Sequence, residues 1–310
     1  MPPAFIIERR AVVWAISFLI VFAALAPFNI TLFGLNPWAG RALVAAALSL
    51  NVFLVGFLPF RIQMIIAWLE LVAVFLLFFY SFNLSYAYIW ERIPHLIGLK
   101  LNRGFLMGAS LTLFICFVSI IASTLLALIA ALARLSRNGI AAGISTFYIS
   151  FFRGTPLLLQ ILLIYLGLPQ LGIVLTPIPS AVIALSLCYG AYMAEIFRAG
   201  IQAIATGQSE AARALGLKEG QIMRLVVLPQ AIRLIIPPTG NQFIAMLKDS
   251  SLVSVLGAWD LMYMARTHGK AEFKYIEMLI TAALIYWILS ATFEVLQARL
   301  EAYYGKSDKR

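Results

Sequence analysis

The sequence predicts an all-α, polytopic integral membrane protein with about eight transmembrane helices and one short helix on the cytoplasmic side. Of its 310 residues, 63% are hydrophobic and only 12% are charged, and the mean hydropathy is +0.95. Soluble domains carry about 45–50% apolar and about 25% charged residues, so the chain differs from them on both counts. This composition excludes a soluble enzyme, a nucleic-acid-binding domain and a secreted disulfide scaffold for the whole chain.

Eight apolar runs are the expected spans, because a helix that rises ~1.5 Å per residue needs about 20 residues to cross a ~30 Å hydrocarbon core. The runs cover residues 11–28, 42–60, 62–82, 105–133, 145–168, 179–199, 232–250 and 276–297. The first run is longer than the ~7–15 apolar residues of a signal peptide, so we expect it to be retained. The seventh is the least regular, because Pro237, Pro238 and Gly240 interrupt it.

The distribution of Lys and Arg predicts the orientation, because positively charged loops tend to stay in the cytoplasm. If both termini are cytoplasmic, 15 of the 23 Lys and Arg residues fall on the inner side. The opposite orientation fits less well. These loops also account for the net charge of +10, so the charge does not require a nucleic-acid partner.

A stretch of mixed, interfacial character at residues 83–103 divides the chain into parts. We expect residues 1–103 to form three accessory transmembrane helices plus this interfacial linker. Residues 104–300 are expected to form a five-helix core, and residues 301–310 a cytoplasmic tail.

The accessory part contains a predicted polar contact between Asn51 and Glu70. Arg61 marks the expected inner turn; Asn51 lies ten residues before it and Glu70 nine residues after it. At ~1.5 Å per residue, both side chains lie about 15 Å deep on antiparallel helices. We therefore predict that they hydrogen-bond to each other. The functional alternative is a docking or proton-linked site.

No residue pattern indicates catalysis or metal binding. Cys116 and Cys188 lie inside apolar runs, where cysteine usually behaves as a small hydrophobe. His95 and His268 lie in expected outer loops without metal-ligand spacing, and we interpret both as surface residues. We therefore expect no metal site, and no enzyme active site, in this chain.

The longest polar interruption between spans, residues 198–233, contains a spaced motif. Its sequence is Glu210-Ala211-Ala212, three residues, Gly216, nine residues, Val226, one residue and then Leu228-Pro229. The spacing resembles the EAA loop of ABC-importer permeases, with Val226 in place of the usual Ile. The resemblance implies a coupling helix on which an ATPase docks. The simpler alternative is an ordinary amphipathic helix at the membrane interface.

The residues of this loop predict its local structure independently of the resemblance. Thr206 and Gly207 can begin a helix, and Gly216 can end it in the left-handed conformation. A second helix from about Lys218 is expected to end before Pro229. The small side chains of Ala211 and Ala212 would allow another protein to approach closely, with Glu210 and Arg213 as charged contacts at the rim. The ATPase-coupling candidates are thus Gly207, Glu210, Ala211, Ala212, Gly216 and Pro229.

Further stretches make the core similar to permeases of the polar-amino-acid type, the histidine, glutamine, glutamate and arginine importers. They are Phe152 to Leu158, Ala191 to Gly200, and Leu247 to Leu252. The resemblance implies a multi-pass component of the bacterial inner (plasma) membrane. It also implies a second permease copy or a related permease, a dimer of ATP-binding subunits, an external solute-binding protein and a polar amino acid as substrate.

ATP and Mg are expected to bind the partner ATPase. The nearest approach to a phosphate-binding loop in this chain, Gly305-Lys306-Ser307, has Leu300 where the motif requires a glycine. The resemblance implies that the chain itself is a transport subunit that works by alternating access. The alternative function is a membrane channel or sensor subunit without ATP-driven transport.

Four polar residues within the spans are candidates for the translocation pathway, because polar groups at membrane depth usually face the bundle interior or a water-filled cavity. Tyr192 and Glu195 share one face of the sixth span, and Asn241 and Lys248 share one face of the seventh. Two alternatives remain: Glu195 pairs with Arg198 three residues later, and Lys248 extends outward to the headgroups.

Overall fold

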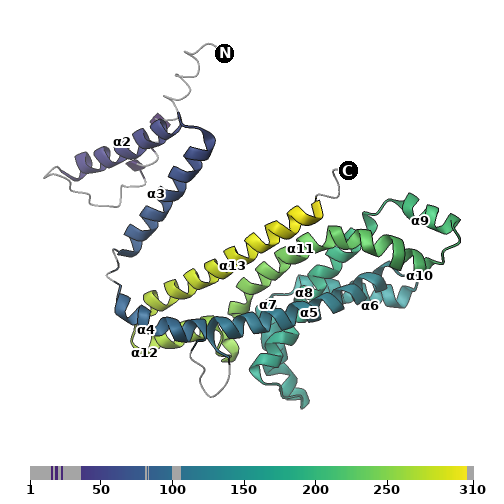
Figure 1. Cartoon of the computed structure of the whole chain (residues 1–310). Coiled ribbons are helices and arrows are strands. Elements are labelled where there is room, and N and C mark those ends of the chain that lie inside the picture. The colour runs from purple at the N-terminus through teal and green to yellow at the C-terminus, as the bar shows by residue number, and fades with distance from the viewer. Residues whose placement is uncertain are drawn as a thin grey trace, which may run out of the picture. The chain divides into compact units, whose positions relative to one another are not determined.

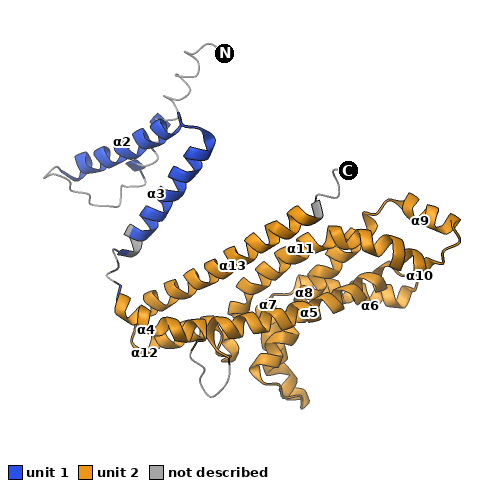
Figure 2. Ribbon diagram, viewed as in Figure 1, with its two compact units in different colours: residues 1–84 blue, residues 85–310 orange. Residues whose placement is uncertain are grey.

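The computed structural model describes residues 15–16, 18–19, 22–23, 36–80, 82, 84–99 and 106–305. These residues confirm the all-α fold class (Figure 1). The chain forms two compact units, residues 1–84 and 85–310, which we call unit 1 and unit 2 (Figure 2). Most of the first predicted span, 11–28, lies outside the described residues.

Unit 1 contains a hairpin of two helices, α2 (Pro37–Val55) and α3 (Phe60–Tyr80). The Asn36 side chain caps α2 by accepting a hydrogen bond from the Ala39 amide at 2.9 Å. The Asn51 Nδ2 atom donates to Glu70 Oε1 at 2.8 Å, which confirms the predicted contact between the two helices. A hydrogen bond between two apolar helices fixes their alignment along the hairpin, which apolar contacts alone specify only weakly.

Unit 2 contains the remaining helices. They are α4 (Tyr86–Ile97), α5 (Gly108–Leu135), α6 (Gly139–Gly154), α7 (Leu157–Leu162), η1 (Leu163–Gly167), η2 (Leu168–Leu171), α8 (Pro177–Gln202), α9 (Thr206–Ala214), α10 (Glu219–Ile222), η3 (Met223–Val227), α11 (Leu228–Asp249), η4 (Ser250–Leu256), α12 (Leu261–Ala271) and α13 (Tyr275–Gly305). Figure 1 shows α9 at one end of this unit and α12 at the other, with the long helices between them.

The core of unit 2 is built around α8, which packs against α5, α6 and α11. Small residues allow this close packing: a Cβ atom on Gly190 would lie 2.6 Å from the Tyr148 hydroxyl and 3.1 Å from the Leu126 Cβ. Within a membrane, such close approach supplies the van der Waals contact that holds helices together. The position of α8 at the centre places Tyr192 and Glu195 next to the neighbouring helix ends.

Five described helical stretches are long and apolar enough to span a membrane. They are Pro37–Val55, Gly108–Leu135, Pro177–Gln202, Glu219–Leu256 and Tyr275–Tyr303. A sixth arises if α6 and the stretch Leu157–Leu171, which meet at a bend of 107°, count as one broken span. These stretches support a multi-pass membrane protein.

The bend between α6 and α7 makes the predicted continuous span over residues 145–168 wrong. Thr155 is extended and precedes Pro156, which disfavours the helical conformation at the residue before it. The buried amide of Gln160 donates to the Phe152 carbonyl and to the Thr155 hydroxyl, both at 2.9 Å. One side chain thereby satisfies a backbone carbonyl that the break leaves without its helical donor.

The prolines of the seventh predicted span do not interrupt it, because α11 continues through Pro237 and Pro238. The Gln297 amide of α13 donates to the Pro237 carbonyl. Gly240 permits this approach, since a Cβ atom there would lie only 1.6 Å from Gln297 Oε1. A neighbouring helix therefore stabilises the irregular part of α11, as membrane helices with proline require.

Candidate functional site

The EAA motif forms a short helix, α9, that ends as the sequence predicts. Gly216 has φ +83°, in the left-handed region. Its amide donates to the Arg213 carbonyl at 3.0 Å, and the Leu217 amide donates to the Ala212 carbonyl at 3.2 Å. These two bonds form a Schellman motif, which satisfies carbonyls at the end of the helix. The turn after α9 is therefore tightly defined.

One face of α9 packs against the rest of unit 2. Ala212 is only 4% exposed and belongs to a cluster with Ile222, Val227 and Ala231. Its small side chain lets α9 approach the core of its own chain, and a role of Ala212 in coupling stays a prediction. Glu210 and Ala211 are exposed and remain accessible to a partner. Gly207 is also exposed, and a Cβ atom there would meet nothing within 4 Å.

A turn at residues 215–218 follows α9, and a continuous helical stretch then leads into the core. The expected end of a helix before Pro229 is wrong, because α10, η3 and α11 follow one another directly. The five residues of η3, Met223–Val227, form a π-helical turn, and Pro229 lies in the first turn of α11. A wider turn accommodates the proline, which has no N–H and clashes with the preceding turn of a regular α-helix. The continuous stretch Glu219–Leu256 therefore connects the turn after α9 to α11.

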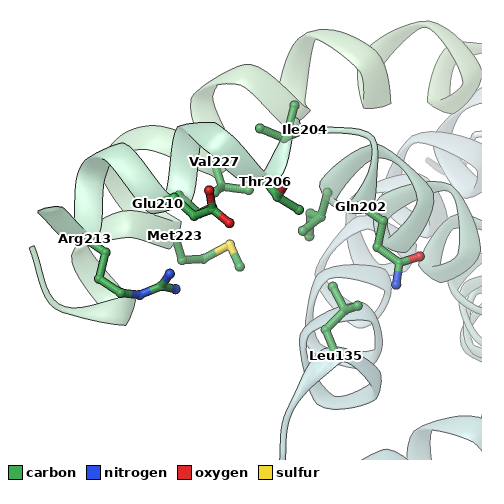
Figure 3. Close-up of a pocket in the computed structure, with 10 residues that line it drawn as sticks. Leu135, Gln202, Ile204, Thr206, Glu210, Arg213, Met223 and Val227 are labelled. Carbon is green, nitrogen blue, oxygen red and sulfur yellow. The ribbon is translucent and has the colours of Figure 1, made fainter.

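A hollow of about 450 Å³ lies beside α9, between this helix, the end of α8 and η3. Figure 3 shows Glu210 and Arg213 on its α9 side and Leu135 and Gln202 across from them. Arg213 forms an ion pair with Glu219 at 2.7 Å. Glu210 forms no ion pair within the described part of the chain, so its carboxylate is available to a partner's cation.

Glu195 binds arginines from three helices. Arg134, at the end of α5, and Arg198, on α8, both donate to its carboxylate, Arg198 at 2.8 Å. Arg153, at the end of α6, has its Nη1 atom 3.9 Å from Glu195 Oε1 and its guanidinium carbon 5.4 Å from the centre of the Tyr192 ring. The predicted alternative of a Glu195–Arg198 pair is confirmed. The spacing along the sequence did not reveal Arg134 and Arg153 as further partners.

The two candidates on α11 lie on its exposed face. Asn241 and Lys248 are both exposed in this chain, whereas Met246 and Leu247 are buried. Among the residues described, no ion pair joins Lys248 to Glu195. The sequence reasoning also missed Asp249, whose Oδ2 atom accepts a hydrogen bond from the Tyr189 hydroxyl at 2.8 Å. A role of these residues in the pathway stays a prediction.

The described residues contain no group of three or more His, Cys, Asp or Glu side chains that could hold a metal ion. Cys116 and Cys188 are both buried and free. The arrangement around α9 and Glu195 consists of caps, ion pairs and packed helices. It can bind a partner and transmit movement.

Comparisons with known proteins find similar transport proteins. The family model described as "Binding-protein-dependent transport system inner membrane component" matches residues 123–304. The probable amino-acid ABC transporter permease protein YckA of Bacillus subtilis (strain 168) is 40% identical over 64% of this chain and 88% of its own length. The arginine transport system permease protein ArtQ of the same organism is 45% identical over 59% of this chain and 84% of its own length.

Solved structures of ABC transporters are also similar to this chain. A crystal structure of an amino acid ABC transporter with histidines matches with a TM-score of 0.60 and 42% identity, over 63% of this chain and 92% of that chain. An inward-facing structure of the MetNI methionine ABC transporter matches with a TM-score of 0.55 and 21% identity, which indicates a shared fold. The second structure also covers 63% of this chain, but its lower identity limits the comparison to the fold.

Proposed function

We propose that this chain, which belongs to the family of binding-protein-dependent transport system inner membrane components, carries polar amino acids inward by alternating access. It is a permease subunit of an ABC importer, a transport component and not an enzyme. The family implies an ATPase, a solute-binding protein and a second permease as partners. The polar-amino-acid substrate rests on ArtQ, whose name gives arginine, and on the solved structure of an amino acid ABC transporter with histidines.

The observation that carries this function is the construction of α9. Glu210 and Ala211 are exposed on one face of this helix, and Ala212 on the other face is buried in the core. We place a dimer of ATP-binding subunits, with ATP and Mg bound to them, against this exposed face. Gly207 leaves room for the partner, Gly216 fixes the turn, and Pro229 lies where the π-helical turn enters α11.

The mechanism follows from the packing of α9 against η3 and α11. When the ATPases close, they displace α9, and the buried contacts of Ala212 transmit the displacement to η3 and α11. Packed helices move as rigid bodies because their interiors resist deformation. The Glu195 ion pairs hold the ends of α5, α6 and α8 together, so these helices move as a group.

We place the translocation pathway along the exposed polar face of α11 and the neighbouring face of α8. Asn241 and Lys248 would line the first face, and Tyr192 and Glu195 the second. A second copy of this permease, or a related permease, would close the route from the other side. Tyr192 is 39% exposed and offers its ring next to the Arg153 guanidinium, which supports a polar route.

We retain eight spans in the proposed membrane topology. Beyond the five described stretches, the broken span of α6 and α7, the helix α3 and residues 11–28 would complete the set. Residues 1–103 would then be accessory, residues 104–300 the transport core with its coupling helix, and residues 301–310 a tail in the cytoplasm. Both termini would lie on the cytoplasmic side of the bacterial inner membrane.

The test is ATP-dependent uptake of labelled polar amino acids into liposomes that contain the chain with its co-purifying ATPase, with and without the binding protein. We expect uptake that needs the binding protein and that Glu210→Arg reduces at least a hundredfold. The control is Glu91→Lys, a charge reversal on α4, at a side chain 65% exposed. Equal uptake by Glu210→Arg and Glu91→Lys would contradict docking at α9, and the absence of any ATPase would favour a channel or sensor.

A further inference from the structure

A second hollow, of about 600 Å³, lies at the end of unit 2 opposite α9. It is formed by η4, α12 and the beginning of α13. Polar side chains line much of it: Ser254, Tyr263, Arg266, Thr267, Lys270 and Tyr275. In the orientation proposed above, this hollow opens on the outer side of the membrane.

The helix α12 presents its polar residues to the hollow as one face. Tyr263, Arg266, Thr267 and Lys270 follow the spacing i, i+3, i+4 and i+7, which places them on the same side of a helix. The opposite side is fixed, because Leu261 and Ala265 are fully buried in a cluster with Met278 of α13. The polar face is therefore held toward the hollow by packing on the other side.

The two cations of this face form no ion pair among the described residues, although the charge of Arg266 acts on the buried Asp260 carboxyl. Among the described residues, no carboxylate oxygen lies within 4.0 Å of the Arg266 or Lys270 side chain. Nearby Arg92, in contrast, forms an ion pair with Glu272 at 3.3 Å. Lys270 lies in the last turn of α12, where the helix dipole stabilises positive charge without a side-chain anion. The donors of Arg266 and Lys270 remain free for an anion that enters the hollow.

We propose that this hollow binds the carboxylate group of an amino-acid solute before the solute enters the route through the core. The inference rests on the function proposed above and adds a recognition site to it. Arg266 and Lys270 would hold the carboxylate, because ionised donors form the strongest hydrogen bonds to it. The rings of Tyr263 and Tyr275 would face the ammonium group and side chain of the solute. A hollow of about 600 Å³ has room for a whole amino acid.

The experiment measures equilibrium binding to the complete permease–ATPase complex in lipid nanodiscs, without the binding protein. The ligands are labelled L-glutamine and L-arginine, with their decarboxylated counterparts 4-aminobutanamide and agmatine as competitors. We expect the wild type to bind the amino acid that it transports at least tenfold more tightly than the matching amine. Arg266→Gln and Lys270→Gln should each weaken the amino acid about tenfold, because each removes a charged donor.

The matched control is Arg137→Gln, which removes an exposed cation beyond the other end of α5 and should leave binding unchanged. Equal affinity for the amino acid and the amine in the wild type would overturn the inference. Unchanged affinity in the Arg266→Gln, Lys270→Gln double variant would also overturn it. If the double variant instead needs more binding protein for half-maximal ATPase stimulation, while its solute affinity is normal, the hollow receives a carboxylate of the binding protein and the inference is wrong.

Uptake separates this inference from the proposed function. Wild-type uptake that needs the binding protein, without carboxylate-dependent binding at the hollow, defeats the inference and leaves the proposed function intact. Absence of uptake, with amino-acid binding that depends on Arg266 and Lys270, defeats the proposed function and leaves the binding site.

Discussion

The two ends of unit 2 use charged side chains in different ways. At the α9 end, one carboxylate, Glu195, joins the arginines of three helices, and Arg213 pairs with Glu219. At the α12 end, Arg266 and Lys270 line a hollow without a carboxylate within ion-pair distance among the described residues. Paired charges hold helices together, whereas charges without partners are available to a ligand. This difference is the reason why we propose force transmission at the α9 end and solute binding at the hollow of the α12 end.

The largest effect is expected from removing the carboxylate that joins the three helices. Glu195→Ala leaves Arg134, Arg153 and Arg198 close together without an anion, in a partly buried site. We expect a loss of about 3 kcal/mol in the free energy of unfolding, at the low end for a broken buried pair because solvent screens these groups. The measurement is thermal unfolding in lipid nanodiscs. The control is Glu294→Ala, an exposed carboxylate of α13, and equal stability of both variants would contradict a joining role.

A smaller effect is expected at the turn after α9. Gly216→Ala places a side chain at φ +83° and should cost about 1 kcal/mol locally. Amide hydrogen exchange at residues 216 and 217 should become about fivefold faster, because that free energy governs local opening. Gly220→Ala is the control, since Gly220 lies in helical α10 with open space around its Cβ position. Equally fast exchange in the wild type and Gly216→Ala would show that the Schellman motif does not control the local opening of residues 216 and 217.

The smallest effect concerns pH at the α12 end. The rings of His95 and His268, the chain's two histidines, lie 5.5 Å apart. Burial, together with the charges of Arg92 and His95, holds the pKa of His268 below its usual value, and Glu272 opposes this shift. The unfolded chain therefore binds this proton more readily, so the stability contributed by neutral His268 is present above its ordinary pKa of about 6.5 and is lost as the pH falls.

We expect the unfolding temperature of the wild type to fall between pH 8 and pH 5 by more than that of His268→Asn. The same scan on Glu195→Gln, at the other end, should show the wild-type pH dependence. A wild type and a His268→Asn variant with parallel pH profiles would contradict this assignment. Both histidines, expected to be surface residues, are half-buried and lie next to each other, a contact that their separation of 173 residues along the sequence conceals.

The sequence predicted those features that depend on short-range geometry. The contact of Asn51 with Glu70 followed from counting residues on either side of a tight turn, and the cap at Gly216 followed from the freedom of glycine. The partners Arg134 and Arg153 of Glu195 depend on how α5, α6 and α8 pack, which periodicity does not specify. The burial of Ala212 and the π-helical turn before Pro229 likewise depend on tertiary contacts.

The ion pairs of Glu195 also bear on how the chain is made. Arg134 leaves the ribosome 61 residues before Glu195, and Arg153 also precedes it. In the orientation proposed above, Arg134 still lacks its carboxylate while α5 enters the membrane, and as a free cation it would keep its end of α5 on the cytoplasmic side. The arrival of α8 then neutralises part of this charge. In that orientation, Arg134 would first guide the insertion of the nascent chain and would afterwards join α5 to α8 in the folded protein.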